Sequence, residues 1–423
     1  MTKTTMTVVA MSACLALPVR AQDVALDQSL SLSQAIAMAL AREPSVRAVR
    51  AEVDVARGMK AQAGLRPGPM VSFEHRREPG GHDTATETGI EWPVDFRRSA
   101  RIATADAEIR VAELEEADAR RQLAADVAAA YGDVAAATRE LAISDEVLAA
   151  ANGQLDLLRA RAAQGAVRPL DRDMVDVDVR RLQAVRTTQV GRVDMALLRL
   201  KRLLGMPSDT AVRITETLED LVASDGPAGG QPATAKPDVQ AAEARIAAAN
   251  ARISEVRSEA RPEVTVFGSY MRMNSGFPQR GFSPAGVMEP IRGQFNYVSG
   301  GAMVTLPLWN RQQGNAAAAT AARQAAEARA DAARLTAAAE VSQAQARYEQ
   351  ARRAVTLYQD GVRPLARRNL DTLRETHQLG RATVSDVLAE QRRYLETERA
   401  YTLALNEAYA ARVSLGRAIG ELR

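Results

Sequence analysis

Few residues of this 423-residue chain have side chains suited to catalysis or metal binding. The only cysteine is Cys14, so the chain can form neither an internal disulfide nor a cysteine-based zinc site. His75 and His82 flank one predicted loop and His377 stands alone, which favours surface residues over metal ligands. We find no G-x-S-x-G, P-loop or H-E-x-x-H motif and no paired catalytic constellation. The sequence therefore predicts neither an enzyme nor a bound cofactor.

Methionines provide the next candidate chemistry, because a thioether sulfur is a ligand for a soft metal such as Cu(I). Four of them lie close together in the second half of the chain: Met271, Met273, Met288 and Met303. No M-x-x-M cluster with cysteine or histidine accompanies them. This favours residues that fill strands and loops, and we predict no metal site.

Two aspartates occupy equivalent positions, Asp171 six residues after Gly165 and Asp386 six residues after Gly380. At a helix start a carboxylate accepts backbone N–H bonds and faces the positive end of the helix dipole, which is worth roughly 1 kcal/mol. Carboxylates at the same positions could instead line a pore and attract cations. The residues alone leave both roles open.

The charge balance excludes one class of partner. Lys and Arg number 55 against 52 Asp and Glu, and two of the basic residues fall in a predicted signal segment. The remaining chain is therefore about neutral. It has no basic footprint for nucleic acid.

Residues 1–21 have the pattern of a secretory signal peptide: basic Lys3, a short apolar core and a small residue, Ala21, at the cleavage site. An alternative is a weak lipobox that ends in Cys14, with lipidation of that cysteine. Both interpretations predict export. After residue 21 no stretch approaches the ~18 apolar residues of a transmembrane helix, so a membrane crossing would require strands closed into a barrel.

The chain contains two copies of one pattern. The interval from Pro93 to Gly165 is 72 residues, and that from Pro307 to Gly380 is 73. The intervals from these glycines to Gly205 and Gly420 are both 40 residues. Further matches join Glu43-Pro44 to Lys236-Pro237, Arg66-Pro67 to Arg261-Pro262, and Leu204 to Ile419. We therefore predict a first repeat over 22–223, a linker rich in Gly, Pro and Ala over 224–236, and a second repeat over 237–423.

Each repeat predicts a helix, two strands, a very long helix, a turn and a returning helix of about 35 residues. The first helix is expected over 31–63, with Ser31 as its cap, and the long helices over 98–164 and 315–379. At ~1.5 Å per residue these long helices span roughly 100 Å, far more than a globular core needs. The expected strands are about 70–77, 84–94, 263–273 and 295–308, with an insertion of about 19 residues between the last two.

Four strands cannot close a membrane barrel, because known barrels begin at about eight. Either the strands form a small water-soluble sheet, or several copies share one barrel. Export, the absence of an apolar helix and two rods of roughly 100 Å together favour the shared barrel.

Two motifs carry a family resemblance. Residues 307–315 read Pro-Leu-Trp-Asn-Arg-Gln-Gln-Gly-Asn, and residues 379–388 read Leu-Gly-Arg-Ala-Thr-Val-Ser-Asp-Val-Leu. With the repeat, they resemble the TolC-like outer membrane efflux family, and the first motif is similar to the heavy-metal-efflux (CzcC-like) branch. The resemblance implies a mainly α fold with a small β part, in which two tandem repeats trimerise into a 12-stranded outer-membrane β-barrel continued by a periplasmic α-helical barrel.

The implied function is a passive exit duct in the outer membrane of a Gram-negative bacterium, conducting substrate that includes heavy-metal cations. Its implied partners are two further copies in a homotrimer, a periplasmic adaptor (membrane fusion) protein, an inner-membrane RND-type transporter and outer membrane lipid. Alternatives are a periplasmic adaptor or coiled-coil scaffold protein, and the same duct serving drug export or type I protein secretion.

The resemblance also implies sites. The adaptor would meet the two turns, whose residues are Gln164, Gly165, Ala166, Val167, Arg168, Pro169, Leu379, Gly380, Arg381, Ala382, Thr383 and Val384. A purely structural reading is that glycine simply ends each helix at positive φ. Asp386, and by the repeat Asp171, would belong to a periplasmic gate. The family's next acidic position is Ala389 here, with Glu390 beside it, which departs from a full acidic gate.

Overall fold

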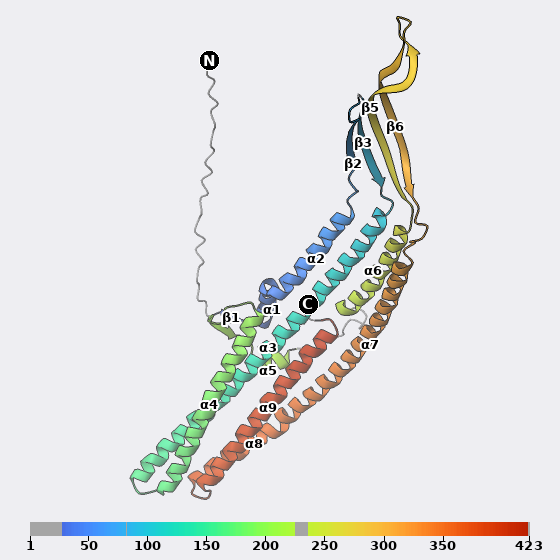
Figure 1. Ribbon diagram of the computed structural model, residues 1–423. Coiled ribbons are helices and arrows are strands. Elements are labelled where there is room, and N and C mark those ends of the chain that lie inside the picture. The colour runs from blue at the N-terminus through green and yellow to red at the C-terminus, as the bar shows by residue number, and fades with distance from the viewer. Residues whose placement is uncertain (1–27, 82, 225–235, 422–423) are drawn as a thin grey trace, which may run out of the picture.

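The computed structural model describes residues 28–81, 83–224 and 236–421. The predicted signal segment with Cys14, His82 and most of the predicted linker lie outside these residues. Long helices run side by side along the molecule, and a β-sheet continues them at one end (Figure 1). The two predicted turns lie together at the opposite end.

The first predicted helix is two helices, so the expectation of one helix over 31–63 is wrong. Helix α1 spans Leu32–Arg42 and α2 spans Pro44–Ala63. Proline disfavours helical geometry in the residue before it, and Glu43 is extended at φ −62° and ψ 124°. The predicted cap is present, because Ser31 and Gln34 form a reciprocal capping box.

Four antiparallel strands form the sheet in the order β2-β3-β5-β6. They span Met70–Arg77, Thr84–Val94, Glu263–Phe282 and Met288–Thr305. The expected bounds of the second pair, about 263–273 and 295–308, are therefore wrong. The inserted residues continue the two strands as a hairpin, with an irregularity between Gly276 and Arg280. β6 ends earlier than expected because Leu306-Pro307 follows Thr305, and proline lacks the N–H that a ladder requires.

A second, two-stranded sheet was not predicted. β1 (Gln28–Leu30) pairs in parallel with β4 (Val212–Ile214), and the short helix α5 (Leu218–Ala223) follows. The fully buried Tyr131 ties this sheet to the long helix of the first repeat. Its hydroxyl donates to the Leu30 carbonyl at 2.8 Å and contacts the Glu216 carboxylate. Burial raises the pKa of Tyr131, so its hydroxyl remains a donor at physiological pH.

In the first repeat, α3 (Arg98–Ala163) and the returning α4 (Pro169–Leu203) form a hairpin. In the second repeat, α6 (Pro237–Glu259) precedes the sheet, and α9 (Val384–Ala418) is the returning helix. Both returning helices have 35 residues. No helix in the described ranges is both long and apolar enough to cross a membrane.

The second long helix is interrupted, so the expectation of one helix over 315–379 is wrong. It consists of α7 (Gln313–Leu357), a π-helical turn η2 (Tyr358–Val362) and α8 (Arg363–Gln378). Together these segments are as long as α3. Pro364 explains the interruption, because its ring clashes with the carbonyl four residues earlier and it offers no N–H to that group.

The two largest apolar clusters of the described residues hold most of the helices together. The larger joins α1, α3, α5 and α9 around Tyr131 and Tyr409. The second lies toward the turns and combines residues of both hairpins, among them Leu155, Val175 and Leu388. The small alanines of α7 that are buried follow mostly seven-residue spacing, which allows close helix packing: Ala319, Ala326, Ala330, Ala337, Ala344 and Ala351.

Candidate functional site

The two turns that join the hairpin helices have the same backbone geometry. Gly165 and Gly380 have φ of 73° and 74°, a region that glycine enters without steric cost. At the first turn, the Gly165 and Ala166 N–H groups donate to the carbonyls of Ala162 and Arg161 at 3.0 and 2.9 Å. This is a Schellman motif, which satisfies carbonyls at a helix end. The bonds of the Gly380 turn are equivalent, with distances of 2.9 and 3.0 Å.

The side chains at the first turn are mostly exposed. Arg168 precedes α4 and makes no side-chain cap. The Asp171 carboxylate, in the first turn of α4, instead accepts bonds from the Arg168 guanidinium at 3.1 and 3.2 Å. Asp171 therefore anchors the loop by an ion pair, and the capping role considered for it is absent from this geometry.

The second turn is more completely bonded. Thr383 and Asp386 form a reciprocal capping box at the start of α9. The Thr383 hydroxyl and backbone N–H donate to the Asp386 carboxylate at 2.6 and 3.0 Å, and they hold the pKa of this carboxyl below its usual range. Across the turn, Nδ1 of the half-buried His377 donates to the Ala382 carbonyl at 2.9 Å. His377, which appeared isolated in the sequence, is thus part of the turn.

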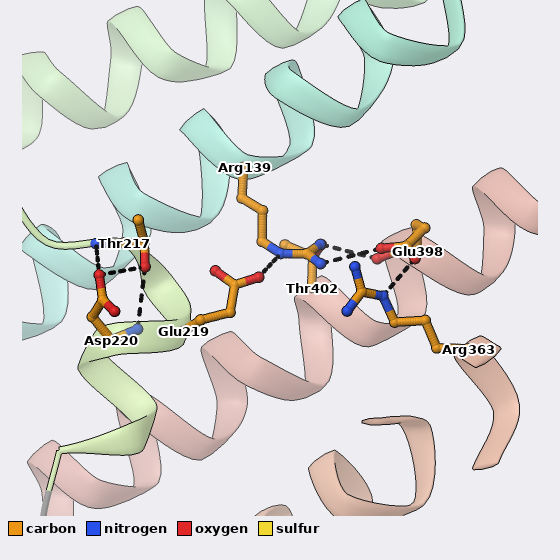
Figure 2. Close-up of polar contacts among 7 residues, drawn as sticks. All are labelled: Arg139, Thr217, Glu219, Asp220, Arg363, Glu398 and Thr402. Atoms are coloured by element: carbon orange, nitrogen blue, oxygen red, sulfur yellow. Dashed lines mark hydrogen bonds and ion pairs between the residues drawn. The ribbon is translucent and has the colours of Figure 1, made fainter. Parts of the chain in front are cut away.

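A cluster of charges around one buried carboxylate joins the two hairpins, and no local sequence pattern predicts it (Figure 2). The Glu398 side chain, only 2% exposed, accepts bonds from Arg139 at 3.1 Å and from Arg363 at 2.6 Å. Arg139 also pairs with Glu219 at 2.5 Å and contacts the Thr402 hydroxyl. The cluster therefore connects α3, α5 and α9 with the first residue of α8, directly after the π-helical turn.

One sequence signal does mark Glu398. It lies seven residues after the buried Gln391 and seven before the buried Leu405, so it occupies the buried stripe of α9. A carboxylate at such a position needs a charged partner. Its partners are 35 and 259 residues away along the chain, which is why local patterns cannot name them.

Strand register separates the sheet into two chemically different faces, because paired residues point to the same side. One face presents exposed apolar side chains: Val71, Phe73, Ile90, Trp92, Val266, Val298 and Val304. The other carries Glu74 opposite Glu87, and Ser269 opposite Ser299. The alternation, unclear in any single strand, becomes clear when the strands are aligned.

The methionines and histidines that the structure describes do not assemble a metal centre. Met271, Met273 and Met303 lie on the polar face of the sheet by register, and Met288 begins β6. His75 bonds to the Thr86 hydroxyl at 2.9 Å. Throughout the described part of the chain, no three His, Cys, Asp or Glu residues are grouped so that they could hold a metal ion.

Comparison with known proteins gives matches over most of the chain. A family model described as "Outer membrane efflux protein" matches residues 35–206 and 232–421. The nickel-cobalt-cadmium resistance protein NccC of Alcaligenes xylosoxydans xylosoxydans is 28% identical over 311 residues. That alignment covers 72% of this chain and 66% of NccC, just under two thirds of the relative's length.

Solved structures share the fold. A membrane protein from Pseudomonas aeruginosa is 23% identical, with a TM-score of 0.73 over 92% of this chain and 93% of that chain. CusC is 18% identical, with a TM-score of 0.74 over 92% and 91% of the two chains. The open state of the MtrE outer membrane channel of Neisseria gonorrhoeae is 20% identical, with a TM-score of 0.73 over 92% and 88%.

Proposed function

The chain belongs to the outer membrane efflux protein family, and from this premise we propose that it is the exit duct of a tripartite pump. The prediction of the family from the sequence is confirmed, as are the predicted outer membrane location and efflux role. In the proposed assembly, a periplasmic adaptor brings substrate from an inner-membrane RND-type transporter to the duct. The duct itself conducts passively.

The sheet is the observation that carries this proposal. One of its faces is rich in exposed apolar side chains, the other is mixed and carries the glutamates and serines, and strands β2 and β6 end the sheet with unpaired edges. Unpaired backbone groups are costly in lipid, so a spanning sheet must close on itself. Four strands are too few for closure. Three copies that pair β2 of one with β6 of the next would give twelve strands, with lipid outside and water inside.

The helices would continue this barrel as a tunnel through the periplasm. α3 has 66 residues, which at ~1.5 Å each correspond to roughly 100 Å. The two turns then lie farthest from the membrane, at the end where an adaptor would approach. Their mostly exposed residues, 164–169 and 379–384, are the contact surface that we propose for it.

Asp386 is our candidate for a gate residue. Three copies would place three carboxylates around the narrow end of the tunnel, where they would attract cations and repel one another. The capping box with Thr383 is compatible with this role, because it uses one carboxylate oxygen and keeps the group ionised. Asp171 is the second candidate, by its equivalent position in the first repeat. Its ion pair with Arg168 leaves it less charge to act on a cation.

The proposed cargo is heavy-metal cations. Two features support this choice: the resemblance to NccC, a nickel-cobalt-cadmium resistance protein, and the acidic side chains on the polar face of the sheet. Glu74, Glu87 and Glu91 share that face, which lines the lumen in the proposed barrel. Arg76 shares this face and pairs with Glu74 at 2.6 Å, so the unmatched negative charge comes from Glu87 and Glu91. Such a wall favours cations without binding any one of them tightly.

The oligomeric mass of protein extracted by detergent from isolated outer membranes tests the central claim. We expect a trimer of 45.5 kDa chains, less the mass of any signal segment that is removed. A water-soluble periplasmic monomer would mean that the strands form a sheet within a single chain, and a scaffold or adaptor would then be the better assignment.

Two variants test the sites in the trimer. Replacing Ala382 with Trp at the half-buried side of the turn should abolish metal resistance of cells while the trimer persists. Loss of the trimer would instead show that this turn serves assembly.

Asp386→Ala should raise single-channel conductance or weaken cation preference, and unchanged conductance would leave Asp386 with its capping role alone.

A further inference from the structure

A hollow lies where the sheet meets the helices, on the apolar side of the sheet. Its volume is about 580 Å³. Its apolar wall includes Trp92 and Val94 of β3, Val266 of β5, and Phe96, which follows β3. Arg66 and Arg98 also line it. Trp92 and Phe96 are 49% and 53% exposed, so the wall is open to whatever surrounds the sheet.

The two arginines give the hollow a net positive charge. Neither Arg66 nor Arg98 has a carboxylate within 4.0 Å among the residues that the structure describes, whereas Arg101, Arg159 and Arg186 of the long helices are paired. Arg98 donates from Nε to the Gly64 carbonyl at 2.6 Å, which orients its guanidinium. The acid beside them, Asp95, is neutralised by Arg101 at 2.7 Å, and this bond lowers the pKa of the Asp95 carboxyl.

A neighbouring hollow of similar size lacks this excess. Arg97, Arg101 and Arg261 line it, but so do Glu255, Glu259 and Glu263. Its charges balance, although Arg261-Pro262 is the repeat counterpart of Arg66-Pro67. The balance around this hollow therefore differs from that around Arg66. Arg66 also lines a third hollow, where Arg97, Arg101 and Arg261 face Asp95 and Glu263, so the positive excess extends from Arg66 toward the second repeat.

The position of the hollow favours a lipid over a neighbouring protomer. Trp92 and Val266 are directly paired on β3 and β5, the two central strands. A copy that pairs with the edge strands β2 and β6 would leave the outer face of these central strands uncovered. In the proposed assembly this face meets the membrane at the periplasmic leaflet, and aromatic side chains are typical of that boundary.

We propose that this hollow binds the headgroup of an anionic phospholipid of the periplasmic leaflet. Guanidinium groups suit this partner, because their planar donors match two phosphate oxygens at once. Arg66 and Arg98 hold the phosphate, and an acyl chain runs along Trp92 and Val266. The inference rests on the proposed function, since it requires the apolar face to lie in a membrane.

The two tryptophans of the chain allow a local test. Trp309 is 88% exposed, so Trp309→Phe leaves Trp92 as the single tryptophan with little structural change. Trimers in detergent are titrated with brominated phosphatidylglycerol or brominated phosphatidylcholine, which quench a tryptophan that they contact. An arginine beside an anionic lipid contributes a factor of about five in affinity. We expect about a tenfold or greater preference for phosphatidylglycerol, which Arg66→Gln should reduce about fivefold.

The control is Arg311→Gln, an exposed arginine beside the Trp309 position that does not line the hollow, and it should leave Trp92 quenching unchanged. Arg66 is exposed, so its replacement should not disturb folding even where that of Arg98 does. Equal quenching by the two lipids in the unsubstituted chain overturns the proposal. Full competition by millimolar inorganic phosphate would reduce the hollow to an anion site and also overturn it. The mass of the same sample separates the claims, because a monomer refutes the duct, whereas a trimer without lipid preference refutes this inference alone.

Discussion

The two helical hairpins have helices of equal length but are held together in different ways. In the first, α3 is continuous, and among the described residues four ion pairs cross from it to α4: Arg159–Asp176, Arg186–Asp145, Arg192–Glu140 and Arg199–Asp133. In the second, the long helix is interrupted at η2, and one such pair crosses to α9, between Arg363 and the buried Glu398.

This difference shows where an ion pair matters. Pairs at the surface are screened by water, and each contributes little to stability. The first hairpin therefore depends mainly on apolar packing between its helices. Glu398 cannot be hydrated once buried, and it needs both of its arginines. The second hairpin therefore concentrates its polar stabilisation at the point where the helix is interrupted.

Glu398→Ala should cause the largest loss of stability. It would remove the buried carboxylate from Arg139, which keeps only its ion pair with the 44% exposed Glu219. Breaking a buried pair costs about 3–5 kcal/mol. Urea unfolding of the detergent-solubilised protein measures the loss. Glu349→Ala, which removes an exposed pair with Arg353, is the matched control and should change the free energy of unfolding by less than about 0.5 kcal/mol. Equal effects of the two variants would contradict the difference in stabilisation between the buried pair and the exposed pairs.

Pro364→Ala should stabilise the second hairpin and make it more like the first. Proline is about 3 kcal/mol less favourable than alanine inside a helix, and η2 relieves part of that cost, so we expect a local gain of about 1–2 kcal/mol. Hydrogen exchange of the amides from Tyr358 to Val362 should slow accordingly. Unchanged exchange would mean that packing around Arg363, and not the proline, maintains the π-helical turn.

Thr383→Ala should weaken the second turn by about 1 kcal/mol, the usual value of such a cap. A pH effect should accompany it. Because the folded-state pKa of Asp386 is depressed, its contribution is present above the unfolded value of about 3.9 and is lost as pH falls through the lower folded value. The variant should raise that pKa, and an NMR titration of the carboxyl would detect the shift. No shift would show that the dipole of α9 dominates the hydrogen bonds.

Asp145→Ala should have the smallest effect. Its partner Arg186 is 45% exposed and the aspartate 44%, so the ion pair is accessible to solvent. We expect a loss of about 0.5 kcal/mol or less, which added salt should diminish further. A loss comparable with that of Glu398→Ala would show that the first hairpin also relies on single pairs.

The features of the fold that depend on a few adjacent residues were predictable from the sequence, and those that depend on strand pairing were not. The turn at Gly380 was located correctly because helix termination depends on a few adjacent residues, and glycine at positive φ marks it. The ends of β5 and β6 were missed because Gly276, Pro278 and their polar neighbours read as a loop. Strand pairing between two long segments overrides such composition when each supplies the other's hydrogen bonds.

The polar contacts of the site were predictable only in part. The Thr383–Asp386 spacing is a recognisable capping signal, in which the threonine completes the cap predicted for the carboxylate alone. The bond from His377 to the Ala382 carbonyl depends on the exact shape of the turn, which residue types alone do not specify. The charges around Glu398 lie on separate elements, so no periodicity encodes their contacts.

The open edges of β2 and β6 have a genetic consequence. If each chain supplies one third of a shared barrel, a defective chain is incorporated beside normal ones through the same strand edges. A single altered tip or gate then impairs a duct whose other two chains are intact. Variants that assemble but do not function should therefore be dominant over the normal allele, whereas variants that fail to form the sheet should be recessive.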